Sequence, residues 1–129
     1  MRALSIRQPY AELILRGEKT IEYRSRPTRI IGEPFYIYAA IKEGDPEAWI
    51  QLEADPIKRI ELATRLATGL IVGKARIAKC IFCPANGHGA RYEWHLSDVE
   101  RLEHPLKPKR MPQLATASRL RRPVWFRPF

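Results

Sequence analysis

The part of the sequence that decides the fold is its beginning, ALSIRQPYAELILRG at residues 3–17. The short apolar run at 3–6 predicts a strand. Pro9 then favours the first position of a helix, since that position needs no backbone N–H. Gly17 is typical of a helix end, because glycine adopts the left-handed conformation there at little cost. We therefore expect a strand followed by a helix over residues 9–16, whose buried side is formed by Tyr10, Leu13 and Ile14.

A second strand is predicted from the next stretch, KTIEYR at residues 19–24. Successive side chains of a strand point to opposite faces, so Ile21 and Tyr23 are expected to share the face that packs on the core. The opposite face then carries two charged side chains and one hydroxyl, those of Thr20, Glu22 and Arg24. A basic loop from 25 to 32 follows this strand.

The rest of the chain contains further strand and helix signals. Strands are predicted at 35–40, 70–82, 92–96, 99–103 and 124–126, with a turn at 97–98, and helices at 47–54 and 57–68. Gly73 lies inside the longest strand, where glycine is typical of a bulge or bend. Asp45 and Asp55 precede prolines and predict helix starts, and Trp94 is expected in the core. The chain shows no repeat and no long linker. We therefore expect one α+β domain over residues 1–129, a small β-barrel of five to six strands with inserted helices.

Positive charge is concentrated at the two ends of the chain, which has 129 residues and a net charge of +9. Residues 1–30 carry seven Lys or Arg against three Glu, and residues 101–129 carry eight against one. The middle, residues 31–100, carries eight against ten acidic residues. If the two ends meet in space, they form one basic face, which attracts phosphates and releases their counterions. A polyanionic partner is therefore favoured over a merely solvated basic surface.

The sequence contains only weak signals for membrane insertion, secretion or metal binding. The sequence has no apolar run long enough to cross a bilayer, and its N-terminus lacks the apolar core of a secretion signal. Two cysteines imply no disulfide framework, so a cytoplasmic location is expected. Cys80, Cys83 and His88 have partial zinc spacing, with His95 or His104 as a fourth ligand. A free cysteine in an apolar strand is ordinary, however, so we expect no metal and no cofactor.

Two motifs resemble a known family: ALSIRQPYA at residues 3–11 and GEKTIEYR at residues 17–24. Together they resemble the ASCH domain, a branch of the PUA-like superfamily, with its first strand, proline-led helix and Gly-x-Lys-x-x-Glu-x-Arg signature. Residues 69–81 and 92–94 are similar to later strands of that family. The resemblance implies a five- or six-stranded barrel with a cleft beside the first helix, and RNA binding or another RNA-related role.

The resemblance also implies two kinds of chemistry. One branch of the family is an amidohydrolase that removes acetyl groups from N4-acetylcytidine and related nucleosides, and ribonuclease activity is another family function. In the amidohydrolase branch, the third position after the signature lysine is a threonine nucleophile, whereas this chain has Glu22 there. This difference favours recognition over the threonine mechanism, although a carboxylate can also activate water.

The predicted site is centred on Lys19, Glu22 and Arg24. Lys19 is expected to pair with a phosphate, Glu22 to accept a base-edge N–H, and Arg24 to bind a phosphate bidentately. Further contacts are expected from residues beside the first helix and in the basic segments: Ser5, Arg7, Gln8, Tyr10, Arg26, Lys107, Lys109, Arg110, Arg119, Arg121 and Arg122.

Three functions compete for this site. The first is nucleic-acid binding, with RNA favoured over DNA. The second is hydrolysis of a modified nucleoside or of RNA, with Lys19 and Glu22 as the catalytic residues. The third is recruitment of a protein partner without chemistry. We expect no membrane partner.

Overall fold

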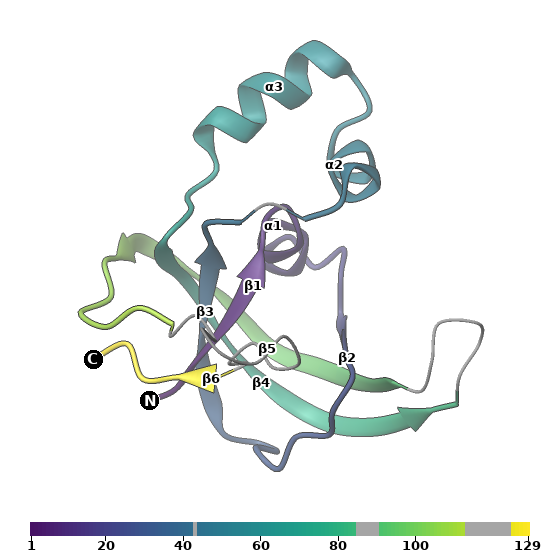
Figure 1. The fold of residues 1–129 in the computed structure, drawn as a ribbon, viewed down its shortest axis with the longest axis vertical. Helices are drawn as coiled ribbons and strands as arrows, with labels where there is room; N and C mark the ends of the chain where they lie inside the picture. The colour runs from purple at the N-terminus through teal and green to yellow at the C-terminus, as the bar shows by residue number, and fades with distance from the viewer. Residues whose placement is uncertain (43, 85–90, 113–124) are drawn as a thin grey trace, which may run out of the picture.

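The computed structural model describes residues 1–42, 44–84, 91–112 and 125–129, and Figure 1 shows the elements within them. The strands are β1 (Ala3–Arg7), β2 (Ile21–Arg24), β3 (Pro34–Ala40), β4 (Leu70–Cys83), β5 (Arg91–Leu106) and β6 (Trp125–Phe126). The helices are α1 (Tyr10–Leu15), α2 (Pro46–Leu52) and α3 (Pro56–Arg65).

All six strands form one curled sheet in the order β2-β5-β4-β3-β1-β6 (Figure 1). β1 pairs with β3 in parallel, and the other neighbours are antiparallel. The predicted α+β class is confirmed. Among the described residues the sheet is barrel-like but open, with β2 and β6 at its edges. The side chain of Arg24 spans part of the opening, because its Nη2 on β2 donates to the backbone oxygen of Ser5 on β1 at 3.1 Å.

The main core joins α1 to the sheet. Ala11 and Ile14 of α1 are buried in one cluster with side chains from β1, β3, β4 and β5. Gly73 packs tightly against α1 and β5: a Cβ there would be 2.5 Å from Cδ2 of Leu15 and 2.8 Å from the backbone oxygen of Glu100. The register between β4 and β5 shifts next to this glycine. The predicted bulge at Gly73 is therefore confirmed.

Helices α2 and α3 lie beyond one end of the sheet (Figure 1). A small apolar cluster attaches them to α1, with buried Leu13, Trp49 and Leu52 and partly buried Leu62 and Leu66. Asp55 begins α3 as predicted, since its carboxylate accepts from the backbone N–H groups of Ile57 and Lys58 at 2.9 and 3.1 Å. α3 itself contains no buried residue, and Ile57 and Ile60 are largely exposed.

Two local predictions are wrong. Tyr23 is exposed, whereas Glu22 is buried, because Glu22 pairs in register with Trp94 and therefore faces the interior of the sheet. The predicted turn at 97–98 does not divide two strands. β5 continues through it, with Asp98 in a positive-φ conformation (φ 50°) and register shifts against β4 nearby.

Candidate functional site

The three signature residues meet at the opening between β1 and β2, and we call Lys19, Glu22 and Arg24 the charged cluster. Lys19 follows α1 after the turn at Gly17, and the other two lie on β2. Glu22 holds both cations: its Oε1 is 3.8 Å from Nζ of Lys19, and its Oε2 is 3.2 Å from Nη2 of Arg24. The three residues at the centre of the predicted site therefore lie together, and their role in ligand binding stays a prediction.

The charged cluster is mostly shielded from water. The side chains of Lys19, Glu22 and Arg24 are 17%, 10% and 22% exposed. Burial lowers the pKa of Lys19 below the ordinary lysine value, the attraction of Glu22 opposes this, and Arg24 adds to the lowering. Two cations share one carboxylate here, so the cluster has a net charge of +1 in a partly desolvated place. Such a site attracts a further anion more strongly than a solvated surface does.

Two tyrosine rings flank the ammonium group. Nζ of Lys19 lies 5.3 Å from the ring centroids of both Tyr10 and Tyr23, which is cation–π distance. The Tyr10 hydroxyl donates to Asp45 at 3.0 Å, and burial together with this carboxylate raises the Tyr10 pKa. Asp45 begins α2 as predicted, but its carboxylate binds this hydroxyl and does not cap the helix. The backbone at Gly44 lies so close to the Tyr10 ring that a Cβ there would be 2.8 Å from Cε2.

Trp94 supports the charged cluster from β5. It is 1% exposed, its ring stacks on Trp125 of β6 at 5.9 Å, and the guanidinium of Arg24 lies 5.8 Å from its ring. Its indole N–H donates to the backbone oxygen of Arg26 at 3.0 Å. The start of the basic loop is therefore fixed beside the charged cluster, while the Arg26 side chain is exposed.

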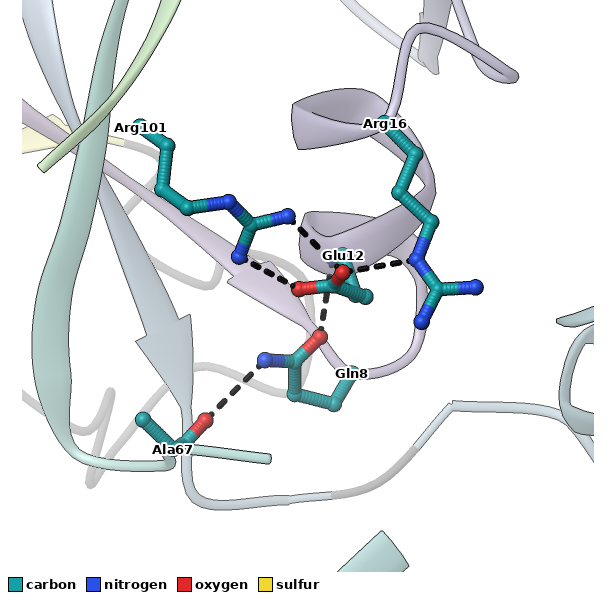
Figure 2. Close-up of polar contacts among 5 residues, drawn as sticks. All are labelled: Gln8, Glu12, Arg16, Ala67 and Arg101. Atoms are coloured by element: carbon teal, nitrogen blue, oxygen red, sulfur yellow. Dashed lines mark hydrogen bonds and ion pairs between the residues drawn. The ribbon is translucent and has the colours of Figure 1, made fainter. Parts of the chain in front are cut away.

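A second polar network connects α1 to β5, and it was not predicted from the sequence. Figure 2 shows the buried Glu12 carboxylate accepting two hydrogen bonds from Arg101 of β5, at 2.9 and 2.8 Å, and one from Arg16 at 2.7 Å. Burial alone would raise the pKa of Glu12, but the hydrogen bonds of the two arginines outweigh it and lower this pKa. The same contacts raise the pKa of Arg101. The i,i+4 spacing of Glu12 and Arg16 is the one sequence signal for this network.

Gln8 belongs to this network and is buried. Its Nε2 donates to the backbone oxygen of Ala67 at 3.0 Å, and its Oε1 accepts from the backbone N–H of Glu12 at 3.0 Å (Figure 2). Both ends of the amide are thereby engaged within the protein. The geometry favours a supporting role for Gln8 over contact with a ligand.

The other predicted contact residues are divided between two places. Ser5 and Arg7 are half-buried on β1. Ser5 lies near the charged cluster, because its backbone oxygen accepts a hydrogen bond from Arg24. Lys107, Lys109 and Arg110 are exposed, and the backbone N–H groups of the last two both donate to Pro128. This segment and the C-terminus lie on the opposite side of the view from β2 (Figure 1). The two chain ends do meet through the pairing of β1 with β6, but the described Lys107–Arg110 stretch lies away from the charged cluster (Figure 1). Arg119, Arg121 and Arg122 lie outside the described residues.

The cysteines give no metal site within the described residues. Cys80 and Cys83 are free thiols, both half-buried on β4, and His88 lies outside the described ranges. No group of three or more His, Cys, Asp or Glu that could hold a metal occurs in the part of the chain that the structure describes. In that same part, no helix has the length and apolar character needed to cross a membrane. The cytoplasmic location stays a prediction.

Comparison with known proteins identifies the family of the chain and agrees with its fold. The ASCH domain family model matches residues 4–106. The solved structure of ASCH from Zymomonas mobilis is similar, with a TM-score of 0.55 and 16% identity over 82% of this chain and 72% of that one. Two single-residue variants of the same bacterial protein match with TM-scores of 0.54 and 15% identity, over 82% of this chain and 72% and 74% of theirs. No curated protein matches by sequence. The family model covers most of the chain, and the chain therefore belongs to the ASCH domain family.

Proposed function

We propose that this protein binds nucleic acid, with RNA favoured over DNA, and that a phosphate of the ligand is bound at the charged cluster. The observation that carries the proposal is the charge balance of the cluster. Lys19 and Arg24 share the single carboxylate of Glu22 while all three are largely shielded from water. A phosphate satisfies the remaining positive charge and accepts hydrogen bonds from both cations.

The arrangement also supports recognition of a base. Both hydrogen bonds of Arg24 among the described residues use Nη2, so either Nε or Nη1 can donate to a phosphate. Glu22 is an acceptor for a base-edge N–H, and Tyr10 and Tyr23 supply aromatic surface beside the ammonium group of Lys19. The exposed Arg26 on the adjoining loop adds a second phosphate contact. The Lys107–Arg110 segment lies elsewhere and would contact only a longer ligand.

The test measures the binding of single-stranded oligonucleotides by fluorescence anisotropy, and it uses RNA and DNA of the same sequence. If four phosphates are contacted, affinity should fall about fifty-fold between roughly 50 and 200 mM salt. Lys19→Gln should weaken binding by about ten-fold or more. Lys58→Gln, which removes the same charge from the exposed helix α3, is the matched control and should have a much smaller effect. Absence of binding at low salt, or equal effects of the two variants, would overturn the proposal.

A second candidate is hydrolysis of an N4-acylated cytidine, and the shielded Lys19–Glu22 pair favours it. Glu22 would take a proton from water as the water attacks the acyl carbon, and Lys19 would stabilise the oxyanion. Glu22 would then return this proton to the exocyclic nitrogen as the bond between that nitrogen and the acyl carbon breaks, and the products are cytidine and the carboxylic acid. Chromatography of N4-acetylcytidine with purified protein tests this. Turnover that disappears in Glu22→Gln supports hydrolysis, and absence of turnover across acyl groups excludes it.

A further inference from the structure

The interior face of the sheet continues beyond the core at the far end of the β4–β5 ribbon. Trp94 of β5 lies between Glu22 of β2 and Cys80 of β4 in the pairing register. Two residues further along each strand, Tyr92 lies between Arg24 and Phe82. Side chains two residues apart on a strand share a face. The row of Arg24, Tyr92 and Phe82 therefore extends the face that buries Trp94.

Burial changes abruptly along this face. Trp94 is 1% exposed, whereas Phe82 is 53% exposed and Tyr92 is half-buried. The rings of Phe82 and Tyr92 pack together, with centroids 5.3 Å apart and a tilt of 58°. Phe82 and Tyr92 thus form an aromatic pair on the same face of the sheet as the buried Trp94, and the Phe82 ring is open to solvent.

The surroundings of this pair are cationic. Arg24 is the direct cross-strand neighbour of Tyr92, and the exposed Arg26 is fixed nearby through the indole of Trp94. Glu22 also lies on this face, and its carboxylate is already bound to two cations. An apolar surface edged by arginines suits a ligand that has both aromatic rings and phosphates better than it suits an apolar peptide.

We infer that Phe82 and Tyr92 form a stacking platform for an unpaired base of a single-stranded nucleic acid whose adjacent phosphate is bound at the charged cluster. The inference rests on the proposed function and specifies its ligand. Arg24 and Phe82 are separated by two strand spacings, about 10 Å. A ligand that reaches both contains at least two nucleotides. Bases within a duplex are already stacked on one another, so a single strand is required.

The experiment compares Phe82→Ala with Phe129→Ala. Phe129 is the matched control, because it is 47% exposed and also packs against a tyrosine, Tyr36, at 5.9 Å. The probe is fluorescein-labelled single-stranded RNA of about eight nucleotides, which is within the usual site size. Phe82→Ala should weaken its binding roughly 5- to 150-fold, the range for loss of one stacked base. The salt dependence should stay that of the unmodified protein, because no phosphate contact is removed. Phe129→Ala should bind like the unmodified protein.

Phe82→Tyr keeps an aromatic face, and it should restore binding to within about two-fold of the unmodified protein. Circular dichroism of each variant establishes that it is folded. If the unmodified protein binds no oligonucleotide at low salt, the proposed function and the platform fall together. If it binds and Phe82→Ala binds equally well, the platform alone is overturned. Equal weakening by Phe129→Ala, or equal weakening for single-stranded and duplex RNA, also overturns it.

Discussion

Replacing Glu12 with glutamine should destabilise the fold by about 3 kcal/mol at neutral pH. The carboxylate accepts three charge-assisted hydrogen bonds, two from Arg101 and one from Arg16. Such bonds are each worth roughly 1.5–3 kcal/mol when shielded. The arginine side chains are 50% and 37% exposed, so water screens them and about 1 kcal/mol per bond is the better figure. Glutamine keeps the shape but presents N–H groups to the same donors.

The pH dependence identifies the carboxylate as the cause. The pKa of Glu12 is lower in the folded protein than its ordinary value of 4.5. Its contribution is therefore fully present above about pH 4.5 and is lost as the pH falls through the lowered folded value. The difference between the original protein and Glu12→Gln should be constant near neutrality and should shrink in acid.

Urea unfolding, monitored by tryptophan fluorescence, measures the difference in the free energy of unfolding between the two proteins. The melting temperature of Glu12→Gln at neutral pH should be lower by roughly 10 °C. Glu103→Gln is the control, because Glu103 lies on the same strand as Arg101 with a side chain that is 91% exposed. It should change stability by less than about 0.5 kcal/mol. A loss below that size in Glu12→Gln, or a loss that is the same at pH 3.5 and pH 7, would refute the reasoning.

Three further predictions concern other parts of the molecule. Gly73→Ala should destabilise by about 1–3 kcal/mol in urea unfolding, because its Cβ would meet Leu15 and the backbone of Glu100; an unchanged midpoint would show that α1 can move away. Asp55→Ala should cost about 1 kcal/mol of helix stability. Because α3 has no buried residue, hydrogen exchange should increase in α3 alone, and exchange spreading into the sheet would contradict this. Raising the pH toward 10.5 should weaken oligonucleotide binding as Lys19 loses its charge, and Lys19→Arg should remove this dependence.

The first strand and first helix are predictable from sequence because their signals are local. Gly17 has φ +79°, the conformation expected at the helix end. The alternation in β2 correctly groups Glu22 with Arg24, but it does not say which group faces inward. Polarity gives the wrong answer here, because the interior carries a charged cluster while the outer Tyr23 packs under the guanidinium of Arg91 at 4.9 Å.

In the site too, contacts between residues close in sequence are predictable, whereas contacts between distant residues are not. Lys19, Glu22 and Arg24 are close in sequence, so their convergence follows from one turn and one strand. Arg101 is 89 residues from Glu12, and no local pattern reveals that they pair. Gln8 shows a further limit of sequence patterns, since the motif does not reveal that both ends of its amide are hydrogen-bonded within the protein.

Arg24 connects two strands that are not neighbours in the sheet, through one hydrogen bond to Ser5. The length and planarity of its side chain therefore set how far apart β1 and β2 stand, in addition to the charge that it provides. A lysine at this position would keep the charge and lose the fixed fork of donors. Position 24 thus has an architectural role in addition to its proposed role in recognition. A comparison of homologues that scores only charge at this position would accept substitutions that the architecture rejects.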